Sequence, residues 1–188
     1  MRYIFISGIP TSGKSYLAKK VAKAIGVLHF EIDKWREKIK DDNIKKWVNF
    51  YFDQDEEKYY KSTSCDEQWE NLKKQSEIFW PKIKSKIDGA VKLNKPAIFE
   101  GVNILPHLAA RDLNFPGIYL LGNSFEEIFE RNKREPRWGN TEKLQKMEAK
   151  SFFYCERPRY KKEAEKYGFK TFENIDEAEK EVIRLLTK

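Results

Sequence analysis

Eight residues near the N-terminus have the types and the spacing needed to hold the phosphates of a nucleotide. The segment 8–15 reads GIPTSGKS and fits the pattern G-x-x-x-x-G-K-[ST] at every fixed position. In such a loop the glycines let backbone N–H groups turn toward phosphate oxygens, the lysine reaches the β- and γ-phosphates, and the last hydroxyl ligates Mg²⁺. The expected nucleotide-binding residues are Gly8, Ile9, Pro10, Thr11, Ser12, Gly13, Lys14, Ser15 and Tyr16. Lys14 would act in catalysis and Ser15 would ligate the metal.

Asp33 and Arg36 form a second pair that could do chemistry. Asp33 follows the predicted strand 27–32, and open α/β sheets bind their ligands at the carboxyl ends of strands. Its carboxylate could accept the proton of an attacking hydroxyl, and Arg36 could hold a phosphate of the same acceptor. An ion pair on a helix surface is the alternative. The position at a strand end makes us favour the catalytic interpretation.

Three arginines spaced three residues apart lie where a predicted helix gives way to a loop. Pro136 and Gly139 break the helix that begins near residue 124. We interpret 131–141 as a mobile lid in which at least one arginine reaches the transferred phosphoryl group. A solvated basic face is the alternative. The three candidates are Arg131, Arg134 and Arg137.

Glu100 ends another predicted strand and is the second candidate for a metal ligand. It could hold Mg²⁺ through water or orient the acceptor. For His29 we expect a packed or rim position and not a metal site, because no second histidine, cysteine or acid stands at metal spacing along the chain.

The elements that would position these residues alternate between strands and helices. A helix is predicted from Ser15 to Ile25 by apolar residues at steps of four, with Gly26 at its end. This alternation predicts a three-layer α/β/α fold around a parallel sheet. The predicted strands are 2–7, 27–32, 96–100, 117–121 and 169–172.

The segment 34–95 is the longest stretch without a predicted strand. Charged and aromatic residues fill it, and we interpret it as a helical insert on the acceptor side. One helix is predicted from about Asp66, with a kink at Pro81. Aromatic residues at helical spacing favour a core position, although a ligand-facing wall is the alternative.

The whole sequence, 188 residues, suits one domain spanning 1–188. Its formal net charge of +7 leaves a nucleic-acid partner open, but interspersed charges and a phosphorylated substrate explain the excess equally well. No apolar run has membrane-spanning length, and the first strand begins almost at once, so we expect a cytoplasmic protein. Cys65 and Cys155 are expected to be free thiols. The sequence indicates no oligomeric state.

On these residues the chain resembles the nucleotide-kinase-like group of P-loop kinases, which includes adenylate, shikimate and gluconate kinases, zeta-toxin-like kinases and polynucleotide kinase. The phosphate loop carries the most specific match. Residues 33–36, DKWR, are similar to the D-x-x-R of several members, and 100–106, EGVNILP, to a segment of archaeal-type 2-phosphoglycerate kinases. The resemblance implies the sheet order 2-3-1-4-5 and an adenine site within 172–176, which includes Asn174.

The expected function is that of an ATP-dependent kinase. It would transfer the γ-phosphoryl group to a hydroxyl or phosphate of a small, anionic acceptor. Polynucleotide 5′-hydroxyl kinase activity is the close alternative, and a regulatory ATPase or nucleotide-dependent switch is the alternative of another class. Two departures from the family bear on the acceptor. The third strand ends in Phe-Glu-Gly and not in a hydrophobic-Asp form, and the insert is not the compact hairpin of adenylate kinase.

Overall fold

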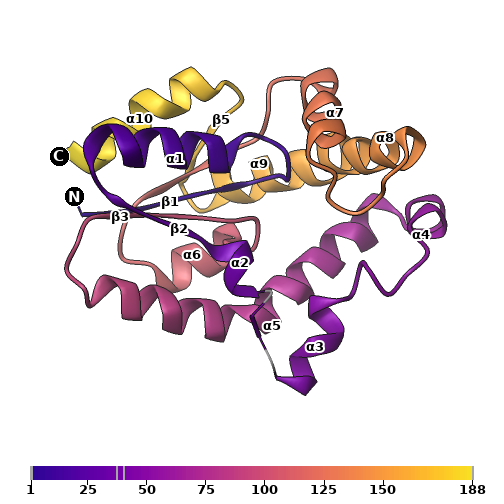
Figure 1. The fold of residues 1–188 in the computed structure, drawn as a ribbon, viewed down its shortest axis with the longest axis horizontal. Helices are drawn as coiled ribbons and strands as arrows, with labels where there is room; N and C mark the ends of the chain where they lie inside the picture. The colour runs from indigo at the N-terminus through magenta and orange to yellow at the C-terminus, as the bar shows by residue number, and fades with distance from the viewer. Residues whose placement is uncertain (1, 37, 40, 188) are drawn as a thin grey trace.

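The computed structural model describes residues 2–36, 38–39 and 41–187. Within this part of the chain, five parallel strands form one sheet in the order β2-β3-β1-β4-β5, which confirms the predicted fold class and order (Figure 1). Each strand begins and ends within one residue of its predicted bounds. The strands are β1 (Tyr3–Gly8), β2 (Leu28–Glu31), β3 (Ala97–Glu100), β4 (Gly117–Leu120) and β5 (Lys170–Phe172).

Helices cover both faces of the sheet, which is why its central strands β3, β1 and β4 are buried and mostly apolar. Alternate side chains of β1 point to opposite faces, so Ile6 packs under α1 (Lys14–Ile25) and α10 (Ile175–Thr187). Phe5 packs on the other side with α6 (Pro106–Asp112) and α9 (Arg157–Lys166). Figure 1 shows α1 and α10 on one side of the sheet and α6 on the other. The carboxyl ends of the strands are thereby left to hold ligands.

The described part of 34–95 contains helices and no strand, as predicted. Its longest helix, α5, begins at Cys65 behind a capping box in which Ser64 and Glu67 bond reciprocally. The helix continues through Pro81 to Val91 as one unbroken element. No helix in the described residues has both the length and the apolar character needed to cross a membrane. The segment begins within α2 (Ile32–Arg36) and continues with α3 (Asp42–Val48), α4 (Glu56–Ser62) and α5 (Cys65–Val91).

A nearly continuous helical run follows β4. After α7 (Phe125–Arg134) and the segment 135–141, α8 (Glu142–Lys150) passes into a π-helix, η1 (Ser151–Glu156), and then into α9. The sequence predicts a single helix from residue 141 to about 166. The π-helical turn inside it was not predicted, and such turns occur frequently at functional sites.

The aromatic residues of the insert divide between core and cavity wall. Trp69, Phe79 and Trp80 are buried in the core, as the helical spacing predicts. Tyr51 and Tyr60 instead line a cavity. The core interpretation is therefore confirmed for the first three residues, while a ligand-facing role for the two tyrosines stays a prediction.

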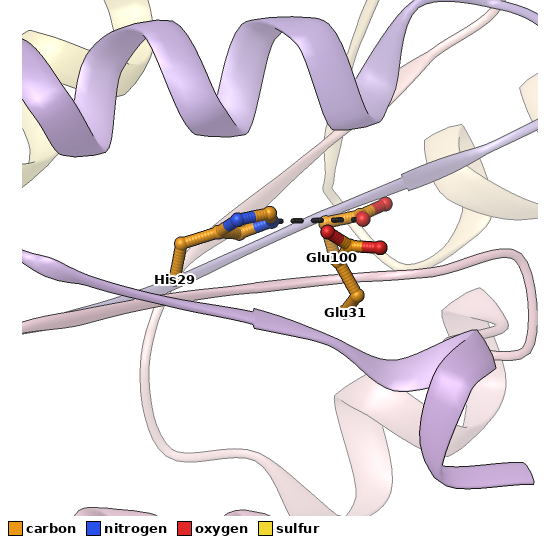
Figure 2. A group of neighbouring side chains, drawn as sticks. All are labelled: His29, Glu31 and Glu100. Atoms are coloured by element: carbon orange, nitrogen blue, oxygen red, sulfur yellow. Dashed lines mark ion pairs between the residues drawn. The ribbon is translucent and has the colours of Figure 1, made fainter.

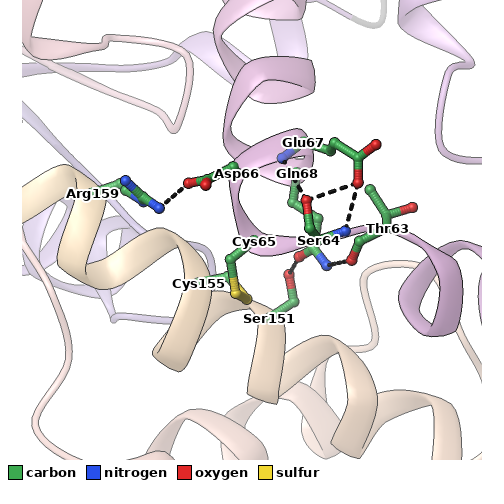
Figure 3. Close-up of a disulfide and its surroundings, with 9 residues drawn as sticks. All are labelled: Thr63, Ser64, Cys65, Asp66, Glu67, Gln68, Ser151, Cys155 and Arg159. Carbon is green, nitrogen blue, oxygen red and sulfur yellow. Dashed lines mark hydrogen bonds and ion pairs between the residues drawn. A yellow bond between two sulfur atoms is a disulfide. The ribbon is translucent and has the colours of Figure 1, made fainter.

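Cys65 and Cys155 are bonded in a disulfide, so the expectation of free thiols was wrong (Figure 3). The bond joins the start of α5 to η1, across a sequence separation of 90 residues. The fold brings these segments together through further contacts, since Ser151 donates a hydrogen bond to Gln68 over 2.5 Å and Arg159 pairs with Asp66. Two isolated cysteines so far apart in sequence give no sign of this proximity.

Reduction of the disulfide is expected to lower the free energy of unfolding by about 2–5 kcal/mol, because the cross-link removes chain entropy from the unfolded state. Urea unfolding with and without a dithiol reductant measures the change. The Cys65→Ser, Cys155→Ser double variant serves as the control. Its free energy of unfolding should equal that of the reduced protein and should not change when the reductant is added. Equal stability of wild type in both conditions would contradict the expectation.

Candidate functional site

The phosphate-loop segment connects β1 to α1 through a tight backbone turn. Gly8 has φ +125°, and a Cβ there would lie 2.1 Å from the carbonyl oxygen of Leu120, so no larger residue fits without a shift. Gly13, with φ +100°, precedes α1 and supplies no capping side chain. The first N–H groups of α1 therefore have no side-chain cap from Gly13, and such groups favour anions.

Lys14 is buried against the loop that surrounds it. Its side chain is 5% exposed, and Nζ donates a hydrogen bond to the carbonyl oxygen of Ile9 over 2.5 Å. Burial lowers the pKa of Lys14 to about 8, while the nearby carboxylates of Glu100 and Asp33 act in the opposite direction. A phosphate at this position would favour the charged ammonium further.

A cavity of about 520 Å³ borders the loop. It brings Lys14 and Ser15 together with the three arginines predicted to form a lid. Arg131 is held on the loop itself, because Nη1 donates to the carbonyl oxygens of Ser12 over 2.9 Å and of Thr11 over 3.3 Å. The lining residues are Thr11, Gly13, Lys14, Ser15, Tyr16, Lys19, Arg131, Arg134, Glu135, Arg137 and Ile175. We call this space the loop cavity.

A second cavity, of about 270 Å³, lies between the carboxyl end of β2 and the helical segments. We call it the aromatic cavity. Asp33 and Arg36 both line it, and so does Arg137, which lines the loop cavity as well. The other lining residues are Pro10, Val48, Tyr51, Phe52, Tyr59, Tyr60, Gln68, Leu72, Gln75, Val102, Pro136, Trp138, Glu148, Ser151, Phe152 and Glu156.

Asp33 and Arg36 are held at the cavity and are not a fully exposed surface pair. Arg36 Nη1 donates to Asn103 Oδ1 over 3.3 Å, and Asn103 Nδ2 donates in turn to Ser76 Oγ over 2.8 Å. Burial raises the pKa of Asp33, which the charge of Arg36 partly offsets. Asp33 Oδ1 and Arg36 Nε are buried without a hydrogen-bond partner among the described residues. Both residues line the cavity, and within the described structure these two atoms lack the partner that buried polar atoms ordinarily have.

Glu100 lies between β1 and β2, with its side chain only 4% exposed. It neighbours Glu31 across the strands, and His29 Nε2 lies 3.6 Å from Glu100 Oε1 (Figure 2). One ligand atom from each of these three residues lies within 4.8 Å of the others. Spacing along the chain did not reveal this group, because the parallel strands β2 and β3 bring His29 and Glu100 together although they are distant in sequence. Glu31 already pairs with Lys19 and Lys34.

Two carboxyl groups of the aromatic cavity were missed in the sequence. Glu148 and Glu156 are 2% and 8% exposed. Burial raises the pKa of Glu148 to about 7 and that of Glu156 to about 8. Asn132 Nδ2 donates to Glu148 Oε2 over 2.7 Å. Neither acid belongs to a motif, and the π-helical turn that ends at Glu156 gives no signal in the sequence.

Two of the predicted nucleotide-binding residues lie at the margin of the site. Tyr16 lines the loop cavity and is 61% exposed. Asn174 precedes α10, where Oδ1 accepts hydrogen bonds from the backbone N–H groups of Asp176 and Glu177. It does not appear among the described residues lining the loop cavity, although its neighbour Ile175 does. An adenine-binding role for Asn174 stays a prediction.

The sequence matches no protein-family model and no curated protein, but solved structures share its fold. Shikimate kinase from Acinetobacter baumannii in complex with shikimate aligns with a TM-score of 0.56 at 11% identity, over 100% of this chain and 93% of that chain. Deoxyadenosine kinase from M. mycoides with bound dATP aligns with a TM-score of 0.53 at 16% identity, over 100% of both. Shikimate kinase from Bacteroides thetaiotaomicron gives 0.54 at 11% identity, over 99% and 98%. The protein therefore has the five-stranded α/β fold of the P-loop kinases, as its sequence indicated.

Proposed function

We propose that the protein is a Mg²⁺-dependent kinase that transfers the γ-phosphoryl group of ATP to a hydroxyl or phosphate of a small acceptor. The observation that carries this proposal is the position of Arg137, which lines both the loop cavity and the aromatic cavity. A triphosphate in the first cavity and an acceptor in the second would meet at this guanidinium. A cation between donor and acceptor is what the charge of a transferred phosphoryl group requires.

The loop cavity would bind the nucleotide. Residues 8–15 would hold the phosphates, with Lys14 on the β- and γ-phosphates and Ser15 on Mg²⁺. Glu100 would support the metal through water or orient the acceptor. Arg131 is bonded to the loop backbone, so its contribution would be to shape the loop. Arg134 and Arg137 would neutralise the moving group, and the segment 131–141 would act as the lid.

The aromatic cavity would bind the acceptor on the inner side of the insert 34–95. Asp33 would accept the proton of the attacking hydroxyl while the acceptor oxygen bonds to the γ-phosphorus. The bond from that phosphorus to the bridging oxygen of ADP then breaks, and ADP leaves with its electron pair. Arg36 would orient the acceptor, since its Nε has no hydrogen-bond partner within the described structure.

Transfer of label from γ-labelled ATP to a panel of acceptors tests the proposal. The panel should contain small alcohols, hydroxy acids, nucleosides, nucleoside monophosphates and a single-stranded oligonucleotide. We expect a small acceptor to become labelled. Slow hydrolysis without a labelled acceptor would favour the regulatory ATPase or switch. Labelling of the oligonucleotide alone, with a steep dependence on salt, would identify a polynucleotide kinase.

A further inference from the structure

An aromatic ring cluster forms one side of the aromatic cavity. Tyr51, Tyr59 and Tyr60 surround Trp138, and each of their ring centroids lies 5.8 Å from that of the indole. The tyrosines belong to the insert and the tryptophan to the segment 131–141, so two distant parts of the chain build this surface. Such a wall favours a ligand with a planar or apolar body, or with a cation that the rings can attract.

Buried carboxyl groups form much of the polar lining. Asp33, Glu148 and Glu156 line the cavity, and Arg36 and Arg137 are the arginines that do so among the described residues. Glu156 Oε2 is a buried atom without a hydrogen-bond partner in the described part of the chain. Three carboxyl groups and two arginines therefore line the cavity among the described residues, whereas a site built for a phosphate or carboxylate presents mainly guanidinium and N–H groups.

Burial makes the ionised forms of Glu148 and Glu156 unfavourable. Burial raises the pKa values of both acids. The pKa of Glu156 is also lowered by the charge of Lys14 and raised by that of Glu148. A negatively charged ligand would add to this unfavourable environment. A ligand that donates N–H hydrogen bonds, or that carries an ammonium group, would relieve it by partnering the carboxylates.

We infer that the acceptor is a nitrogen-bearing alcohol without a negative charge. Its nitrogen donors face Glu148 and Glu156, its hydroxyl faces Asp33, and its body lies against the aromatic rings. This inference rests on the proposed kinase function and departs from the anionic acceptor that the sequence led us to expect. The cavity volume, about 270 Å³, suits a small molecule. Nucleosides and amino sugars both present this chemistry.

Calorimetric titration of the whole protein tests the inference without relying on catalysis. The probes are adenosine and cytidine for nucleosides, glucosamine and galactosamine for amino sugars, and glycerate and gluconate for anionic hydroxy acids. Binding of one nitrogen-bearing group, with release of a proton from the buried acids at about pH 7, is the expected result. The proton appears as a dependence of the binding enthalpy on the buffer. Binding of the acids alone, or of none of the nitrogen compounds, would overturn the inference.

Glu156→Gln provides the matched variant, because it keeps the size of the side chain and removes the carboxyl group that would release a proton when the ligand binds. We expect it to weaken binding of the nitrogen compound at least about 10-fold and to leave ATP affinity unchanged. Glu165→Gln on exposed α9 surface is the control and should bind both ligands normally. Unchanged acceptor binding in a folded Glu156→Gln variant would contradict the inference. If the variant does not fold, the wild-type titration tests the inference instead. Binding of a nitrogen compound without release of a proton would then contradict it.

The outcomes separate this inference from the kinase proposal. Labelling of gluconate or glycerate by γ-labelled ATP, with no labelling of nitrogen compounds, leaves a kinase with a different acceptor. Failure of ATP to bind the wild-type protein removes the kinase proposal and with it the basis for naming an acceptor.

Discussion

Lys14→Ala is expected to abolish detectable phosphoryl transfer, with a loss of about 10³-fold or more, the order that a single cation on a transferred phosphoryl group contributes. Lys14 is buried within the loop and lines the loop cavity. Its ammonium would contact the β- and γ-phosphates, so ATP affinity should also fall. Single-turnover transfer of labelled phosphate, together with nucleotide titration, measures both effects.

Lys23→Ala is the control for Lys14→Ala, because Lys23 is an exposed lysine of the same helix, α1. Its transfer rate and ATP affinity should match those of the wild-type protein. Thermal unfolding of both variants establishes that the loop and helix are folded. Transfer at a wild-type rate in a folded Lys14→Ala variant would show that the phosphates are held elsewhere.

Asp33→Asn is expected to slow transfer by about 10²–10⁴-fold, the range of general base catalysis, while ATP affinity stays within about twofold. Asp33 lines the aromatic cavity and is not part of the loop cavity, so its loss should act on the acceptor step. Single-turnover transfer and nucleotide titration again separate the two. An equal loss of ATP binding would place Asp33 on the nucleotide.

The pH dependence of transfer provides a second readout for Asp33. Burial raises the pKa of its carboxyl group above the ordinary value. The ionised base is present above that pKa and is lost as the pH falls through it, so wild-type transfer should fall on the acid side. Measured at saturating acceptor, so that Glu148 and Glu156 are already partnered by the ligand, Asp33→Asn should lack this acid limb. Asp53 is an exposed acid of the same insert and serves as the control. Asp53→Asn should retain the wild-type rate and its decrease at acid pH.

The architecture was largely predictable because its signals are local. Each strand is a short run rich in aliphatic or aromatic residues that is followed by a helix start or a glycine, and each was found within one residue. The loop 8–15 carries its chemistry in consecutive residues, so its place between β1 and α1 followed directly. Asp33 was recognisable for a similar reason, since a strand end marks where ligands bind in such sheets.

The aromatic cavity could not be predicted because it is assembled from distant segments. Glu156 comes from a π-helical turn, Trp138 from the segment after α7, and Tyr51 from the segment between α3 and α4. None has a spacing relation to the others along the chain. The disulfide and the proximity of His29 to Glu100 could not be predicted for the same reason, because both depend on which elements meet in space.

The shared position of Arg137 has a thermodynamic consequence. One guanidinium that borders two cavities cannot adopt independent positions for two ligands. Any displacement of Arg137 by a triphosphate changes the free energy with which the acceptor binds, and linkage requires the acceptor to change nucleotide affinity by the same factor. For the proposed pair of substrates, the response of Arg137 to each ligand would therefore contribute to the cooperativity of their binding.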